Sequence, residues 1–167
     1  PPLFHIIASL FYIIFSPING ELGLKLIAPL AGSGTLVLSY LILKRFLNEK
    51  ALFYSILFMS FIPISIDYSI LGYVESTLTF FVILSIYFAL NNRFFLSGIA
   101  VGLSILTKYN GLLVIPVLLF IAYKYCKNKK LLLRNVLITI FVPGIIGLPW
   151  FIRNWILLGN PLWPFLN

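Results

Sequence analysis

Long stretches of the chain contain apolar residues and no charged residue. Six of them are long enough to form helices: 26–43, 51–66, 76–92, 94–107, 109–123 and 135–152. A membrane-crossing helix needs about 20 apolar residues, with about 17 as the lower limit, and three of the six stretches reach that limit. Lys and Arg at the ends of the shorter stretches can extend to the headgroups and supply the missing length. Because helix formation satisfies every backbone group in hydrocarbon, the pattern predicts an all-α bundle of about six membrane spans.

The two ends of the chain follow a different pattern. Residues 3–15 are a 13-residue apolar run between Pro2 and Pro17, which is too short to span the membrane and predicts a helix in the outer interface. Residues 149–167 hold all three Trp, which favour the membrane boundary, and three Pro, which we expect to prevent one long helix. We expect a single transmembrane domain with an outer interfacial segment at 1–22, six membrane helices at 23–152, and an outer aromatic and Pro-rich segment at 153–167.

The composition excludes a water-soluble protein. Hydrophobic residues make up 61% of the 167 residues and charged residues 10%, whereas a soluble domain carries about 25% charged residues. In a soluble protein the net charge of +8 would suggest binding to nucleic acid. In a membrane protein the question is instead on which side of the bilayer the cations lie. We therefore expect lipid and not nucleic acid as a partner. The single cysteine, Cys126, excludes an internal disulfide and a cysteine-built metal site.

The cations predict which way the chain crosses the membrane. If the spans alternate, nine of the twelve Lys and Arg fall on one side: Lys44, Arg45, Lys50, Arg93, Lys124, Lys127, Lys129, Lys130 and Arg134. The positive-inside rule places this side in the cytoplasm. The opposite side receives three of the four acids together with the remaining cations: Glu21, Asp67, Glu75, Lys25, Lys108 and Arg153. We therefore expect a functional site on the extracytoplasmic face, where separate helices carry Glu75 and Lys108 to one shared, outward-facing hollow.

Glu75 lies at the outer end of the stretch 76–92. One interpretation is a structural one, in which the helix dipole favours an acid at this position and Ser76 caps the helix. The other is a functional one, in which the carboxylate holds a substrate hydroxyl or a divalent cation at the membrane surface.

Lys108 follows a short apolar stretch and should therefore lie below the headgroups. The stretch 94–107 rises by about 21 Å, against a hydrocarbon core of about 30 Å. A cation at that depth marks a functional site, unless the side chain extends outward and only anchors the helix. We expect Asn110-Gly111 to break the helix, with Gly111 left-handed. The next helix, 111–125, would then point its positive N-terminus at Lys108 and complete an anion site.

Other polar residues have weaker signals. Arg153-Asn154 lies between two Trp residues and would pair with a lipid phosphate or with a bound substrate. His5 and Lys25 are expected along the same outer surface, and Asp67 is expected to be a solvated loop acid. Two small-residue motifs, Gly98-x3-Gly102 and 31–34 (AGSG), lack the context of a phosphate loop, so we interpret them as helix-packing contacts.

Short motifs occur in order along nearly the whole chain. They are Pro1-Pro2-Leu3, Gly23-Leu24-Lys25-Leu26, 68–75 ending in Glu75, 102–109 (GLSILTKY), Pro149-Trp150 with Arg153-Asn154, and Gly159-Asn160-Pro161. Together they resemble the GT-C membrane glycosyltransferases, specifically the protein-mannosyltransferase-like and aminoarabinose-transferase-like group. That group takes a sugar from a polyprenyl-phosphate donor on the outer face of the membrane. The chain differs from it in having Lys25 where Arg is usual and Glu75 where Asp is more frequent.

The resemblance implies a function and assigns residues to it. The chain is expected to be the central part of a multi-pass cell-membrane glycosyltransferase that transfers a sugar to an unidentified acceptor on the extracytoplasmic face. The group's acidic catalytic motif precedes the PPL element, so the main base is expected before residue 1 and the fragment is expected to be inactive alone. Glu75 is expected to position the acceptor or a divalent metal. The expected substrate-binding residues are Lys108, Arg153, Asn154, Tyr109 and His5.

Two other classes of protein fit the same pattern of spans. A transporter or flippase for a lipid-linked or anionic solute would place paired polar groups at mid-membrane, often in repeated halves. Here the acids lie at the ends of the stretches and no internal repeat occurs, which favours a transferase. A purely structural membrane subunit would leave Lys108 without an explanation.

Overall fold

A computed structural model describes residues 2–70, 73–126 and 128–163. Every regular element in these ranges is a helix, so the all-α prediction is confirmed. In chain order the helices are α1 (Leu3–Phe15), α2 (Gly20–Leu43), α3 (Glu49–Ser60), α4 (Pro63–Ile70), α5 (Val74–Leu90), α6 (Phe94–Thr107), the 3-10 helix η1 (Tyr109–Val114), α7 (Ile115–Tyr125) and α8 (Lys129–Leu158).

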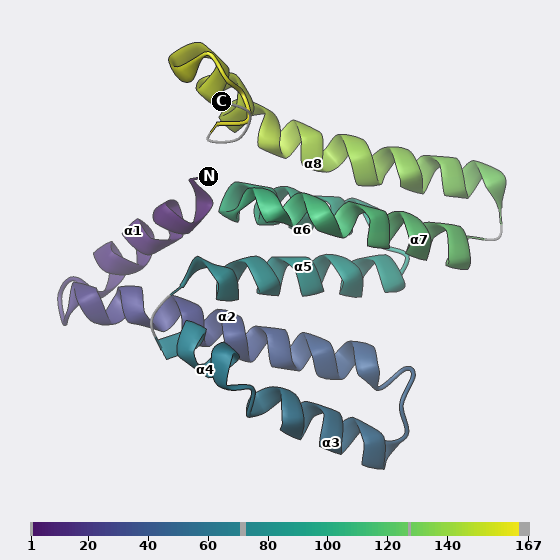
Figure 1. Cartoon of the computed structure of the whole chain (residues 1–167), viewed down its shortest axis with the longest axis horizontal. Coiled ribbons are helices and arrows are strands. Elements are labelled where there is room, and N and C mark those ends of the chain that lie inside the picture. Colours follow the sequence, from purple (N-terminus) through teal and green to yellow (C-terminus); the bar gives the residue numbers. More distant parts are fainter. Residues whose placement is uncertain (1, 71–72, 127, 164–167) are drawn as a thin grey trace.

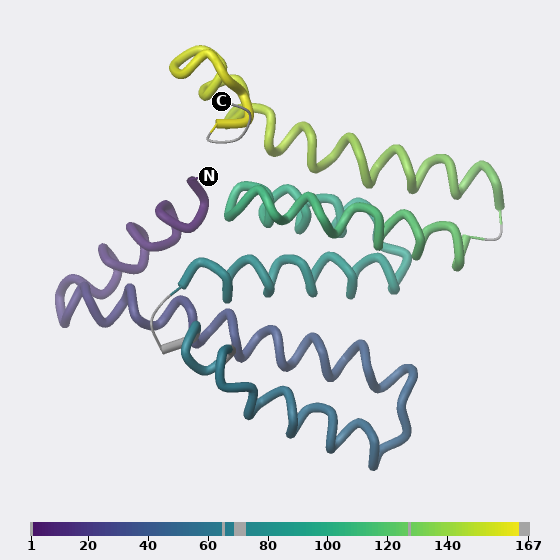
Figure 2. The backbone as a smooth tube through the Cα atoms, viewed as in Figure 1, coloured from purple at the N-terminus to yellow at the C-terminus, as the bar shows by residue number. Residues whose placement is uncertain are grey.

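The long helices lie side by side and alternate in direction (Figure 1). The end of α2, the turn from α5 to α6, and the adjacent ends of α7 and α8 share one end of the molecule, on the right in Figure 1. The start of α2, the start of α5 and the end of α6 share the other end, next to α1. The tube in Figure 2 follows the same alternating path. Residues far apart in sequence therefore meet at each end of the bundle.

Among the helices of the described residues, α2 and α8 are long and apolar enough to cross a membrane. The other apolar helices are shorter: Leu3–Phe15, Val74–Leu90, Phe94–Thr107 and Tyr109–Tyr125. The stretches 76–92 and 94–107 thus form the helices that the sequence predicts, α5 and α6. The number of spans, about six, stays a prediction because the shorter helices would need their flanking residues to cross.

The stretch 51–66 is not one helix, contrary to the sequence prediction. Instead α3 ends at Ser60 and α4 begins at Pro63. Proline has no backbone N–H to continue the hydrogen bonds of α3, and its ring disfavours the helical conformation of the preceding residue. The chain therefore breaks here and changes direction before α5.

The C-terminal region also differs from the prediction. Proline was expected to prevent one long helix in 149–167, but α8 continues through Pro143 and Pro149 to Leu158. The helix bends in its last turns (Figure 2), which is how a helix accommodates the hydrogen bond that an internal proline removes. It ends at Gly159, whose φ of +68° is the left-handed conformation that a helix C-terminus favours.

Helix α6 is at the centre of the packing. Its buried residues include Val101 and Ile105, which belong to the same apolar cluster as Leu118 and Ala122 of α7. On the side facing α8 its residues are small. A Cβ atom at Gly98 would lie 2.9 Å from Cβ of Val142, and one at Gly102 would lie 2.7 Å from Cβ of Ile146. The packing role predicted for these two glycines is confirmed, because any larger residue would push α8 away.

The second small-residue motif has a similar role in α2. A Cβ atom at Gly34 would lie 2.7 Å from the ring of Phe80, so this glycine lets α2 approach α5 closely. Large apolar side chains nevertheless remain exposed on the outside of the bundle, among them Phe58 (76% exposed), Ile14 (67%) and Ile145 (67%). An exposed apolar surface of this kind is typical of a protein whose solvent is lipid.

Candidate functional site

The polar end of the bundle contains a direct contact between Lys108 and Glu75. Nζ of Lys108 lies 2.6 Å from Oε1 of Glu75, although the two residues are 33 positions apart in sequence. Glu75 is in the first turn of α5, and Lys108 directly follows the last residue of α6. The antiparallel packing of α5 against α6 therefore brings a carboxylate and an ammonium group together. Both residues were predicted to face one outer hollow from separate helices, but their direct contact was not predicted.

The backbone around Lys108 holds its side chain in place. Lys108 leaves the helical conformation (φ −157°, ψ 142°), while its N–H still donates to the carbonyl of Ser104 at 2.9 Å. Its own carbonyl accepts a hydrogen bond from the N–H of Gly111, also at 2.9 Å. These bonds fix the direction in which the lysine side chain leaves the helix.

Gly111 has a different role from the predicted one. Among the described residues, positive φ angles occur at Asn92 and Gly159 and not at Gly111. A Cβ atom at Gly111 would instead lie 2.6 Å from the carbonyl carbon of Ser104, so glycine is needed because the backbone packs against α6.

The helix predicted over 111–125 is also incorrect. The 3-10 helix η1 comes first and α7 begins at Ile115, so no α-helix N-terminus lies directly at Lys108.

The electrostatics of this contact favour the charged form of Glu75. The side chains of Lys108 and Glu75 are 40% and 30% exposed. Glu75 lies just outside the charge-free stretch 76–92, and the hydrogen bond from Lys108 lowers the pKa of its carboxyl against the opposing effect of partial burial. A first-turn acid is also favoured by the dipole of α5. The capping prediction for Ser76 is wrong, because α5 begins at Val74 with Tyr73 at the N-cap.

One oxygen of Glu75 is left over from this contact. Within the described residues, Oε2 is buried and has no hydrogen-bond partner. The residue Glu75 lines a cavity of about 400 Å³ between α2, α5 and the α3–α4 region, which we call the Glu75 groove. Its polar lining residues besides Glu75 are Ser33, Thr35, Ser60, Tyr68, Ser76 and Thr79. None of these hydroxyl residues was predicted as part of a site, and Ser76 was predicted only as a helix cap. The available signal was a set of hydroxyl residues inside otherwise apolar stretches, but single hydroxyls of this kind also occur in ordinary helix packing.

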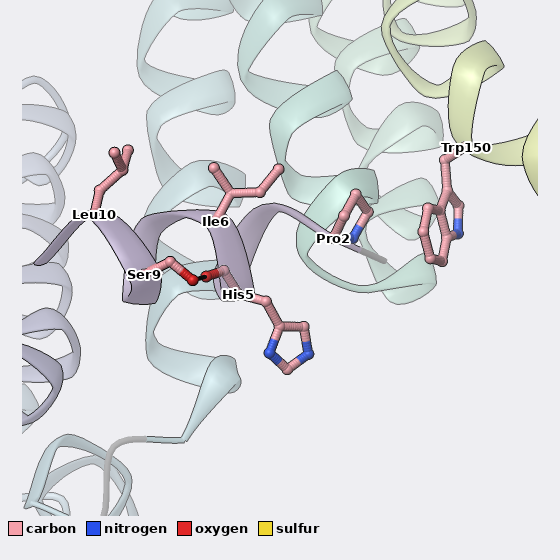
Figure 3. Close-up of a pocket in the computed structure, with 6 residues that line it drawn as sticks. All are labelled: Pro2, His5, Ile6, Ser9, Leu10 and Trp150. Atoms are coloured by element: carbon pink, nitrogen blue, oxygen red, sulfur yellow. Dashed lines mark hydrogen bonds between the residues drawn. The ribbon is translucent and has the colours of Figure 1, made fainter. Parts of the chain in front are cut away.

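His5 lies in a different cavity. This second cavity, of about 480 Å³, is formed by α1 and α8 and is lined by Pro2, His5, Ile6, Ser9, Leu10 and Trp150. Figure 3 shows the imidazole of His5 pointing away from the axis of α1, with Trp150 at the far side. None of these residues lines the Glu75 groove. The structure therefore brings His5 close to Trp150 and separates it from Glu75.

The other predicted substrate-binding residues form one hydrogen-bonded cluster. The hydroxyl of Tyr109 accepts from Nε1 of Trp150 at 2.9 Å and from Nδ2 of Asn154 at 3.0 Å. Arg153 donates to Oδ1 of Asn154 at 3.2 Å, and its guanidinium group lies 4.9 Å from the centre of the Trp150 ring. Tyr109 and Asn154 are buried, whereas Arg153 is exposed. The cluster thus holds an accessible arginine at the polar end of the bundle.

This cluster makes a testable contribution to stability. We expect Trp150→Phe to lower the free energy of unfolding by about 1 kcal/mol, because the variant removes a donor from the buried hydroxyl of Tyr109. The matched control is Trp155→Phe in the same helix, where the indole is 65% exposed and little should change. Thermal melting of the full-length protein in detergent measures both. Equal melting temperatures for the two variants would contradict the structural role of the Trp150 bond.

The remaining polar residues named in the sequence analysis, Lys25 and Asp67, have exposed side chains. Lys25 is exposed in α2, and Asp67 is exposed within α4 and not in a loop. No group of three or more His, Cys, Asp or Glu side chains that could hold a metal ion occurs in the part of the chain that the structure describes. Glu75 is the one carboxylate that lines its groove, so the described residues do not by themselves provide a set of metal ligands.

The apolar surface and the ion pair at one end define an integral-membrane protein with a polar site at one end of its helices. The family model of dolichyl-phosphate-mannose-protein mannosyltransferases matches residues 1–156, and the chain belongs to this family. This membership confirms the resemblance to protein-mannosyltransferase-like membrane enzymes.

The chain is also similar to an uncharacterized protein from Aquifex aeolicus (strain VF5). The two are 33% identical over 154 residues, which are 90% of this chain and 35% of the relative. The chain thus spans about a third of the length of that relative. No solved structure matches the chain.

Proposed function

We propose that this chain is part of a GT-C glycosyltransferase that transfers a sugar from a polyprenyl-phosphate donor to an acceptor on the extracytoplasmic face of the membrane. The observation that carries the proposal is the half-exposed Lys108, held by Glu75 at the polar end of a bundle from this family. A lysine there meets the main requirement of the reaction, which is a cation for a phosphate leaving group.

Lys108 acts on the charge that develops as the sugar leaves its donor. An acceptor hydroxyl attacks the anomeric carbon, the bond from that carbon to the phosphate oxygen breaks, and the electron pair leaves with polyprenyl phosphate. The ammonium group of Lys108 stabilises this negative charge. The hydroxyl proton passes to a base, for which the resemblance supplies the acidic motif that the family carries before its PPL element. Glu75 keeps Lys108 in position until the donor phosphate binds.

The cluster around Tyr109 supports the same site from α8. Arg153 is the second accessible cation and holds the phosphate from the outer rim. Tyr109 and Asn154 position Trp150 and Arg153 through the hydrogen bonds described above. His5 contacts the substrate from the cavity on the other side of Trp150. In this proposal Tyr109 and Asn154 are positioning residues, because both are buried.

The distribution of cations supports the assignment of the site to the extracytoplasmic side. Eight exposed cations belong to the end of the bundle on the right in Figure 1: Lys44, Arg45, Lys50, Arg93, Lys124, Lys129, Lys130 and Arg134. Lys127, which the prediction also includes, lies outside the described residues. The positive-inside rule favours the cytoplasm for this end and the outside for the Lys108–Glu75 end.

A transfer assay tests the proposal. Membranes that contain the full-length protein are incubated with polyprenyl-phosphate mannose labelled in the sugar. We expect the label to appear in a new covalent product, with release of polyprenyl phosphate, and we expect none of this with membranes that lack the protein. Movement of the intact labelled donor across sealed vesicles without a new product would instead support a flippase and overturn the proposed transfer.

A further inference from the structure

Several polar groups that line the Glu75 groove are placed to accept hydrogen bonds from a ligand. Three hydroxyls in its walls donate their proton to a backbone carbonyl four residues earlier, each at 2.8 Å: Thr35 to Ala31, Ser60 to Ile56, and Thr79 to Glu75. A hydroxyl has one proton to donate, so these oxygens can only accept from a bound molecule. A ligand that satisfies them must bring donors of its own.

Glu75 adds the strongest acceptor of the groove. Oε1 is bound to Lys108, whereas Oε2 is buried and has no partner among the described residues. A carboxylate oxygen that is buried without a donor destabilises the protein, and a donor from a ligand would remove that penalty. Since the acceptor is charged, the resulting bond would be shorter and stronger than one between neutral groups.

The shape and the walls of the groove narrow the class of ligand further. The lining also includes apolar residues, among them Leu36, Met59 and Ile62. A purely apolar chain would leave the hydroxyls unsatisfied, and an anion inside the groove would lie beside Glu75 and away from Lys108, which is not among its lining residues. A sugar ring has hydroxyl donors for the acceptors of the lining and C–H groups for its apolar residues. The volume of about 400 Å³ lies within the range of about 300–1,000 Å³ that is typical of small-molecule sites.

We propose that the Glu75 groove holds the sugar that is transferred, and that the carboxylate of Glu75 accepts a hydrogen bond from one of its hydroxyls. Glu75 is then a specificity-determining residue for the donor sugar. This inference rests on the proposed function, because the phosphate is placed at Lys108. The sugar of a polyprenyl-phosphate donor is bonded directly to that phosphate, and the carboxylate of Glu75 is 2.6 Å from the Lys108 ammonium group. The groove begins where the sugar must lie.

The test compares donors that lack single hydroxyls. The full-length enzyme is assayed with polyprenyl-phosphate mannose and with its monodeoxy analogues, and sugar-free polyprenyl phosphate is used as a competitor. We expect the wild type to discriminate against one deoxy analogue by about tenfold or more in kcat/KM, as sites that bind a substrate hydroxyl do. In Glu75→Met, which has no acceptor oxygen, that discrimination should fall to about threefold or less. Competition by sugar-free polyprenyl phosphate should not weaken, because Lys108 remains.

Two further variants keep the test decisive. Thr79→Val removes a groove hydroxyl without changing shape or charge, and should also reduce the discrimination between donors, so it decides the question if Glu75→Met does not fold. Glu21→Met replaces another first-turn acid, exposed in α2 and outside the groove, and should behave as the wild type.

The outcomes separate this inference from the proposed function. Absence of transfer by the wild type would remove the proposed function. Transfer with an unchanged deoxy pattern in Glu75→Met and Thr79→Val would leave that function standing and overturn the sugar site. Equal loss of the mannosylated and the sugar-free lipid in Glu75→Met would also overturn it, since Glu75 would then act only through Lys108.

Discussion

Lys108→Ala in the full-length protein is expected to lower the rate of sugar transfer by at least about tenfold, and by up to about a thousandfold, as the loss of a group that stabilises developing negative charge does. The variant removes the ammonium group that contacts Glu75 and leaves the carboxylate without its partner. Because the cation acts on the leaving phosphate, the loss should appear mainly in kcat. The measurement is the initial rate with labelled polyprenyl-phosphate mannose.

Two controls accompany this variant. Lys50→Ala removes an exposed lysine from the other end of the bundle and should leave transfer unchanged. Lys108→Arg keeps a cation and should retain part of the activity, although the geometry of the head group differs. The amount of each protein in the membrane shows whether insertion is intact. Transfer by Lys108→Ala at a rate close to that of the wild type would exclude Lys108 from the mechanism.

Gly111→Ala is expected to lower the stability of the protein. The new Cβ atom would lie 2.6 Å from the carbonyl carbon of Ser104 and 2.8 Å from the backbone nitrogen of Ile105. These are backbone atoms of the central helix α6 and cannot move as a flexible side chain can. We expect a cost of about 1–3 kcal/mol, which is typical of an overpacked site. Since Gly111 donates to the carbonyl of Lys108, the position of the lysine should change as well.

Gly144→Ala is the matched control for this prediction. Gly144 lies within α8, and a Cβ atom there would have no heavy atom within 4 Å. Alanine is preferred to glycine inside a helix by about 1 kcal/mol, so this variant should melt at the same or a higher temperature than the wild type. A melting temperature of Gly111→Ala equal to that of Gly144→Ala would show that the contact with α6 is not tight.

The close approach of the helices could be predicted from the sequence at some positions and not at others. Gly98 and Gly102 lie four residues apart on one face of a helix, and this spacing alone predicts that another helix packs there. Gly111 was interpreted as a left-handed helix end because it follows Asn110. The spacing of Gly98 and Gly102 can be read within a single helix. The contact of Gly111 with Ser104 cannot, because it depends on the path that the chain takes after α6.

The sequence by itself determined the all-α class and the bounds of some of the helices. Apolar stretches that stop at charged residues or at proline define elements such as α1 and α6 almost residue by residue, because backbone groups in an apolar environment must form helices. The order of short motifs also identified the family that the comparison with known proteins then confirmed.

The tertiary structure alone decided which polar groups meet. The contact of Lys108 with Glu75, the hydroxyls that share a groove with Glu75, and the separation of His5 from that groove all join residues from different helices. A hydroxyl in an apolar stretch has the same local pattern whether it lines a cavity or packs against a neighbour. Only the rotation and distance of the packed helices distinguish the two, and these depend on side-chain contacts along their whole length.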